Sequence, residues 1–116
     1  MAPPPRAIPV YFYRTAPGGE PVRDWLRELP TEDRQRIGRA LALVQYGWPV
    51  GMPLCRSLGA GLWEVRCNLP SRRIARVLFF VQGDRIGVVH GFIKKTQRTP
   101  PEDLALARLR MKEMLS

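Results

Sequence analysis

The spacing of apolar residues changes halfway along the chain, and this change limits the folds that the chain can adopt. Within residues 21–47 apolar side chains recur at every third or fourth position, as on one face of a helix, and Pro30 divides the stretch in two. Within residues 62–93 they alternate with polar residues or form short continuous runs, which is typical of strands. Both patterns in one short chain favour helices packed on a sheet.

The order of the predicted elements follows from these patterns. Ile8–Arg14 is predicted as a first strand, and the two short helices around Pro30 are predicted to form an N-terminal helical hairpin. Three further strands are predicted over Leu62–Cys67, Ile74–Val81 and Ile86–Ile93. The T-P-P-E run at residues 99–102 has the capping residue, proline and glutamate of a helix start. We therefore predict an α+β fold, with helices on one face of a mainly antiparallel sheet of about four strands.

The length of 116 residues is enough for one hydrophobic core. Residues 1–7 are rich in proline, so we predict a flexible lead there and a single domain over residues 8–116. No apolar run approaches the roughly 18 residues of a membrane span, and the N-terminus lacks the apolar stretch of a signal peptide. The two cysteines have neither zinc-site nor disulfide-framework spacing. We expect a cytoplasmic protein that does not contact a membrane.

Positive charge is concentrated in the middle of the chain. The formal net charge is +9, but residues 34–101 hold twelve basic residues against only Glu64 and Asp84, while the two ends are close to neutral. Genome composition can explain why most of the basic residues are arginine, but it does not explain why they cluster in one part of the chain. A local positive field attracts polyanions, and nucleic acid is the commonest of them.

Several enzyme classes lack their sequence signals. The nucleotide-binding patterns G-x-x-x-x-G-K-[ST] and G-x-G-x-x-G are absent, as is the hydrolase pattern G-x-S-x-G. A single histidine and the absence of C-x-x-C argue against a transition-metal site. Carboxylates are scarce where the positive charge concentrates, which argues against a two-metal nuclease. We expect neither a metal nor a cofactor.

Cations on the predicted strands suggest chemistry on RNA. Arg66 and Arg76 lie on the two arms of a predicted hairpin, and Lys94 and Lys95 end the next strand, so these four are predicted to converge at one edge of the sheet. A lysine whose pKa is lowered by neighbouring cations can take the proton of a ribose 2′-hydroxyl. Arginines can stabilise the charge that grows on the phosphate, and His90 or a second cation can protonate the 5′-oxygen. Such a cluster can cleave RNA without a metal.

Structural explanations remain open for the same residues. Arg72 and Arg73 flank a hairpin turn, where solvated arginines are common, and the lysine pair also fits an ordinary strand end. Arg76 lies among apolar residues and needs a partner, for which Glu64 is the candidate. His90 is predicted to share a strand face with Ile86, Val88 and Phe92, so a hydrogen-bonded core histidine is the simpler interpretation.

Five segments together resemble a known family. They are P-V-R-D-W-L-R-E-L-P at residues 21–30, L-W-E-V-R at 62–66, R-I-A-R-V-L-F-F at 73–80, V-V-H-G-F-I-K-K-T-Q-R-T-P at 88–100 and A-x-x-R at 107–110. In these segments and their order the chain resembles the HigB-like branch of the RelE/ParE superfamily, whose members are toxins of type II toxin–antitoxin modules in bacterial genomes and prophages. The H-G-F-x-K-K-T block is the most specific part of the resemblance.

The resemblance implies a RelE-like, microbial-ribonuclease-type fold and a ribosome-dependent mRNA endoribonuclease. It also implies a cognate antitoxin, often a small helix-turn-helix protein, and mRNA in the ribosomal A site as substrate. Arg66 and Arg76 match the strand arginines that contact the scissile phosphate, Lys94 and Lys95 match the basic pair near the cleavage site, and His90 falls at a commonly polar position. The arginines expected to bind RNA are Arg56, Arg72, Arg73 and Arg98.

One departure and two alternatives accompany the resemblance. Some superfamily toxins use a tyrosine near the C-terminus, but no aromatic residue follows Lys95 in this chain. A ParE-type gyrase poison shares the fold and lacks the ribonuclease cluster. A module that binds RNA or antitoxin without catalysis is the third class of function.

Overall fold

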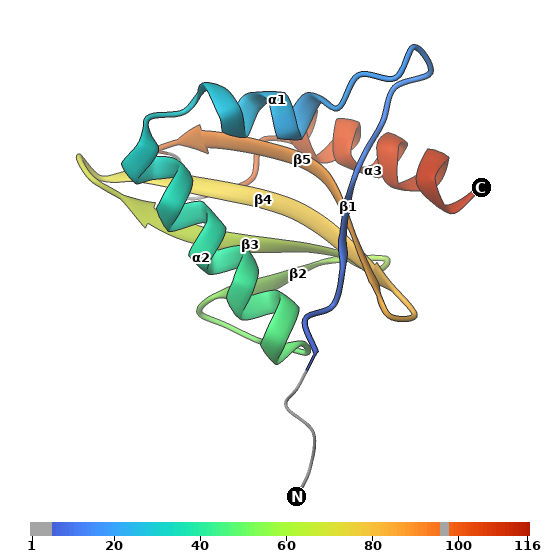
Figure 1. The fold of residues 1–116 in the computed structure, drawn as a ribbon, viewed down its shortest axis with the longest axis horizontal. Helices are drawn as coiled ribbons and strands as arrows, with labels where there is room; N and C mark the ends of the chain where they lie inside the picture. Colours follow the sequence, from blue (N-terminus) through green and yellow to red (C-terminus); the bar gives the residue numbers. More distant parts are fainter. Residues whose placement is uncertain (1–5, 96–97) are drawn as a thin grey trace, which may run out of the picture.

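The computed structural model describes residues 6–95 and 98–116, so residues 1–5 of the predicted flexible lead lie outside the described part. The elements are β1 (Val10–Phe12), α1 (Pro21–Glu28), α2 (Thr31–Gly47), β2 (Cys55–Gly59), β3 (Leu62–Leu69), β4 (Arg73–Gln82), β5 (Arg85–Lys94) and α3 (Pro101–Leu115) (Figure 1). The predicted α+β class is confirmed. Within the described residues, no helix combines the length and the apolar character needed to cross a bilayer.

The sheet has five strands in the order β1-β5-β4-β3-β2. β2, β3, β4 and β5 pair antiparallel with their neighbours, whereas β1 pairs parallel to β5, with Val10 opposite Ile86 and Phe12 opposite Val88. The prediction of about four strands in a mainly antiparallel sheet is therefore corrected to five strands in a mixed sheet. The first strand is also shorter than the predicted Ile8–Arg14, because only three of its residues form the ladder.

Helices cover both faces of the sheet, which corrects the prediction that they share one face. α1 packs on β5 and α2 packs on β3, and α3 packs on the opposite face of β4 and β5 (Figure 1). α1 and α2 pack on different strands and share one core cluster with the sheet, so the predicted helical hairpin is not matched exactly. We call the side of the sheet under α3 the α3 face.

Alternation along the strands explains the two cores. On β4, Val77 and Phe79 belong to the core under α1 and α2, whereas Leu78 and Phe80 belong to the core under α3. Successive strand residues point to opposite faces, so a strand that is apolar at every position must be covered on both sides. β4 is the central strand for this reason.

A β-bulge in β5 shifts this alternation by one residue. Leu78 lies opposite His90 and the next residue, Phe79, lies opposite Val88, so Val89 has no counterpart on β4. The extra residue moves His90 to the α3 face, away from Val88, which lies under α1 and α2. The prediction that His90 and Val88 share one face is therefore wrong.

Gly91 lets α1 approach the sheet closely. A Cβ atom built on Gly91 would lie 2.4 Å from Cζ3 of Trp25 in α1, which is far inside van der Waals contact. Gly91 therefore admits close packing of α1 on β5. Gly87 does not have this role, because a Cβ there would meet Phe80 of the neighbouring strand at 2.4 Å.

Gly91→Ala is expected to lower the free energy of unfolding by about 1–3 kcal/mol, because overpacking displaces Trp25. The matched control is Gly38→Ala on the exposed side of α2, where a Cβ meets nothing within 4 Å. That change is expected to raise stability by about 0.5–1 kcal/mol, because alanine favours the helix. Urea unfolding of both variants measures the difference, and equal effects in the two variants would contradict the packing argument.

Candidate functional site

The strand register brings three of the predicted catalytic cations together on the α3 face. Arg66 of β3 lies opposite Arg76 of β4, which in turn lies opposite Phe92 of β5. Phe92 packs in the core under α3, so the whole row belongs to that face. Lys94 follows two residues after Phe92 on the same strand and therefore points to the same side.

Arg76 forms a buried ion pair with Glu64, as the structural explanation of this arginine predicted. Arg76 exposes 0% and Glu64 2% of its surface, and Arg76 Nε donates a hydrogen bond of 3.2 Å to Glu64 Oε1. The hydroxyl of Thr99 donates to the other carboxylate oxygen, and the Arg76 guanidinium lies 6.0 Å from the centroid of the Phe92 ring. Thr99 was predicted to cap α3, but the N-cap is Pro100. Glu64 thus fastens the segment before α3 to the sheet.

Asp103, in the first turn of α3, binds two more of the predicted catalytic residues. Its Oδ1 accepts a hydrogen bond of 2.7 Å from Nε2 of His90, and its Oδ2 accepts one of 2.7 Å from Nζ of Lys94. Burial acts to raise the pKa of Asp103, but the hydrogen bonds from His90 and Lys94 outweigh it and hold the pKa below its ordinary value. Lys94 is therefore next to an anion, which corrects the expectation that only like charges crowd it.

Arg73, one of the predicted RNA-binding residues, is held by α2. Its Nη1 and Nη2 donate to the two oxygens of Asp33 at 2.7 and 3.0 Å, and its Nε donates to the carbonyl of Pro70 at 3.1 Å. The hydrogen bond from Arg73 lowers the pKa of Asp33. Since each guanidinium nitrogen already donates one hydrogen bond, Arg73 is held in place and adds positive charge to its surroundings, and each Nη atom keeps a second N–H.

Two adjoining clefts at the β3–β4 hairpin contain the exposed cations. Arg66 lines a cleft of about 320 Å³ with Pro53, Leu54 and Asn68. Asn68 also lines a second cleft of about 430 Å³ that includes Arg72, Arg73, Ile74 and Lys95. Within the described part of the chain, the side chains of Arg66, Arg72 and Lys95 form no hydrogen bond or ion pair. We call this region, defined by Arg66, Asn68, Arg72 and Lys95, the basic clefts.

The two remaining predicted RNA-binding arginines lie outside the basic clefts. Arg56 is exposed on β2 opposite Glu64, so it extends the α3 face toward the β2 edge of the sheet. Arg98 is exposed and directly precedes Thr99, in the segment that Glu64 holds. Both lie beside the catalytic candidates rather than among them.

The arrangement is suited to binding phosphate and moving protons. Free guanidinium groups in the basic clefts match phosphate oxygens, and His90 and Lys94 carry exchangeable protons on the neighbouring part of the face. The described residues bring no three His, Cys, Asp or Glu side chains together in a group that could hold a metal ion.

Sequence reasoning missed Asn68 and Asp103. Asn68 lies beyond the predicted strand Leu62–Cys67, but it is the exposed penultimate residue of β3. Asp103 lies in the first turn of a helix, where the helix dipole stabilises an acidic side chain. Its position in the sequence therefore gave no sign that it also binds residues of the sheet. Only the packing of α3 on β5 brings Asp103 to His90 and Lys94.

Arg76→Ala is expected to lower the free energy of unfolding by about 3–5 kcal/mol, because it leaves the Glu64 carboxylate buried without its cation. Arg66→Ala removes a half-buried side chain without such a partner and is expected to cost less than about 1 kcal/mol. Chemical denaturation of the two variants tests the contrast. A similar loss in both would show that the burial of the ion pair is not what distinguishes the two arginines.

The stability that Asp103 contributes is expected to depend on pH in one direction. Its pKa in the folded chain is below the ordinary 3.8, so the contribution is present above that value and is lost as the pH falls through the folded pKa. Asp103→Asn cannot ionise, so the difference in unfolding free energy between the natural chain and this variant should shrink between about pH 5 and pH 2. A constant difference across this range, measured by urea unfolding at each pH, would contradict the assignment.

Comparison with known proteins places the chain in a family. No curated protein matches its sequence. A family model with the description "Phage derived protein Gp49-like (DUF891)" matches residues 24–112, which extend from the first turn of α1 to the last turns of α3 and include every residue of the basic clefts. Because this match covers most of the sequence, the chain belongs to the phage-derived Gp49-like family.

Proposed function

We propose that this protein is the toxin of a type II toxin–antitoxin module, of the HigB-like branch of the RelE/ParE superfamily, and that it cleaves mRNA on the ribosome without a metal. Membership of a phage-derived, toxin-like family supports the toxin assignment. Its partners in this proposal are a cognate helix-turn-helix antitoxin and mRNA in the ribosomal A site, and it acts in the cytoplasm.

The observation that carries the nuclease assignment is the arrangement of cations in and beside the basic clefts. Arg66, Arg72 and Lys95 are available to a ligand there, whereas Arg73, Arg76 and Lys94 are held by carboxylates of this chain. The available cations can attract a phosphodiester, and the cations held by carboxylates keep the surface around them in a fixed shape. A surface that only bound a protein would not need His90 and Lys94 fixed by one carboxylate.

The proposed reaction balances without a co-reactant. The ribose 2′-oxygen bonds to phosphorus while the bond between phosphorus and the 5′-oxygen breaks, which leaves a 2′,3′-cyclic phosphate and a 5′-hydroxyl. One proton leaves the 2′-hydroxyl and one reaches the 5′-oxygen, and we assign these transfers to the pair of His90 and Lys94. The imidazole of His90 takes the first proton, and the Lys94 ammonium beside the Asp103 carboxylate gives the second. Arg66 stabilises the charge that develops on the phosphate oxygens.

Two carboxylates have positioning roles in this proposal. Asp103 holds His90 and Lys94 in fixed orientations, and Glu64 does the same for Arg76. Arg76 has no exposed surface, so its contribution is to neutralise Glu64 beneath Arg66 rather than to contact phosphate.

The test is mRNA cleavage in a reconstituted translation reaction, with the 5′ ends of the fragments mapped. The natural chain is expected to cut ribosome-bound mRNA and to leave 5′-hydroxyl ends. Arg66→Ala is expected to lower the cleavage rate about 10²-fold, because it removes a donor to the developing charge. Arg39→Ala, which removes an exposed arginine from α2, is the matched control and should leave the rate unchanged.

The other function classes are expected to give different results in assays with purified gyrase and in cells that express the chain. DNA breaks in the presence of gyrase, with intact mRNA, would identify a gyrase poison. Binding to ribosomes or antitoxin without cleavage and without growth arrest would identify a binding module. Equal loss of cleavage in the Arg66 and Arg39 variants would mean that overall charge, and not the basic clefts, supports the activity.

A further inference from the structure

The β-bulge in β5 allows His90 to reach α3. Val89 packs in the core under α3, and His90, the next residue, donates from Nε2 to Asp103 of the same helix. In a regular strand two successive side chains point to opposite faces, so one of these two contacts would be lost. The bulge permits both contacts, because its extra residue re-aims the side chain that follows. The position of His90 in the proposed reaction therefore depends on the geometry of the bulge.

A side chain of α3 holds the main chain of the bulge. The extra residue of a bulge loses its place in the ladder of hydrogen bonds, and Val89 has no counterpart on β4. Nη1 of Arg110 donates a hydrogen bond of 3.0 Å to the carbonyl oxygen of Val89. Val89 is fully buried, so a carbonyl without a partner there would lower the stability of the fold. Arg110 thus stabilises the bulged main chain directly before His90.

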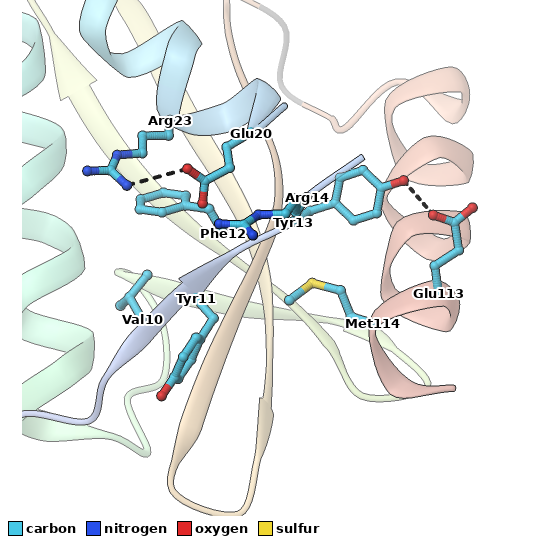
Figure 2. A pocket seen from close by; sticks show the side chains of 9 residues that line it. All are labelled: Val10, Tyr11, Phe12, Tyr13, Arg14, Glu20, Arg23, Glu113 and Met114. Carbon is cyan, nitrogen blue, oxygen red and sulfur yellow. Dashed lines mark hydrogen bonds and ion pairs between the residues drawn. The ribbon is translucent and has the colours of Figure 1, made fainter. Parts of the chain in front are cut away.

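The preceding carbonyl, that of Val88, is held from the side of β1. The amide of Tyr13, which directly follows β1, donates a hydrogen bond of 2.9 Å to this carbonyl. The Tyr13 ring also stacks on Arg110, with 5.0 Å between the guanidinium and the ring centroid. The Tyr13 hydroxyl donates to Glu113, three residues further along α3 (Figure 2). These contacts fix both peptide groups before His90 and therefore the direction in which its side chain leaves the strand.

The direction of the imidazole matters for the proton that it receives. Because Nε2 donates to Asp103, the lone pair that a general base needs is on Nδ1. A base acts only on a proton within hydrogen-bond reach, and a misplacement of about 1 Å can lower a rate on the order of 10²-fold. Asp103 holds the ring at one atom, and the bulge holds the main chain from which the ring extends.

We infer that Arg110 is a positioning residue of the proposed reaction: through the carbonyl of Val89 it keeps the bulge in the geometry that directs His90 toward the substrate. The chemical role rests on the proposed nuclease function, whereas the contact between Arg110 and the bulge is a feature of the fold. Arg110 does not line the basic clefts, so it acts through His90 and not on the phosphate.

Cleavage of ribosome-bound mRNA by two methionine variants tests the role. Arg108→Met is the matched control for Arg110→Met, because Arg108 also lies on α3 and also donates to main-chain carbonyls, at 2.7 and 3.2 Å. Those carbonyls are on β2, which β3 and β4 separate from β5. Arg110→Met is expected to lower kcat about tenfold or more at an unchanged KM for the ribosome complex, and Arg108→Met to change kcat less than about twofold. Arg110→Lys keeps a donor and is expected to lose less activity than Arg110→Met.

Amide hydrogen exchange of the full chain without ribosomes tests the contact independently of catalysis. In Arg110→Met the amides of Val89 and His90 are expected to exchange at least about tenfold faster, relative to the amides of β3, than in the natural chain, whereas Arg108→Met should leave this ratio unchanged. Unchanged exchange at the bulge in Arg110→Met, or an equal loss of cleavage in the two methionine variants, would overturn the inference and leave the proposed function intact. A natural chain that cleaves no mRNA would overturn the proposed function and the positioning role with it, whatever the exchange shows.

Discussion

The ion pair between Glu64 and Arg76 fixes the relation between the sheet and the helix that covers its polar face. Both charges lie in an almost water-free position, where neither is stable without the other. The second oxygen of Glu64 accepts the hydroxyl of Thr99, so the pair also fastens the segment that leads into α3. Asp103 follows four residues later and reaches Lys94 and His90 because of that anchoring.

Carboxylates divide the positive charge of the central region into two groups. Asp33, Glu64 and Asp103 each hold at least one cation that the sequence places in the same basic stretch. The held cations shape the surface, and the cations without such partners in the described chain remain available to a ligand. Net charge alone does not distinguish the groups, because it counts a buried arginine and an exposed one equally.

Local patterns predicted much of the fold and part of the site. The antiparallel strands and the facing of Arg66 and Arg76 follow from alternation and turn residues in neighbouring segments, and the start of α3 was predicted to within one residue. The errors concern contacts between distant segments. β1 pairs with a strand more than seventy residues away, and nothing in the local sequence of Val10–Phe12 indicates that partner. The apolar residues on both sides of β4 require that each face of the sheet is covered. They do not indicate which helix covers which face.

The site was predicted less completely, for the same physical reason. Arg66, Arg76 and Lys94 were found because charges on strands are unusual. Asp33 and Asp103 were missed because acids in the first turn of a helix are common and need no partner there. Their partners come from β4 and β5, so the interaction exists only in the packed molecule.

The extra residue at Val89 divides β5 into two segments, and the alternation of side chains between the two faces of the sheet reverses from one segment to the other. Before the bulge, Ile86 and Val88 fill the core under α1 and α2, and after it, His90 and Lys94 point to the other side of the sheet. Before the bulge, the strand is constrained by the volume of the core. After it, packing constrains Gly91 and Phe92, and hydrogen bonds to Asp103 constrain His90 and Lys94. The polar positions 90 and 94 can thus diverge while the apolar positions of the same strand stay fixed, which separates the requirements of folding from those of the polar surface.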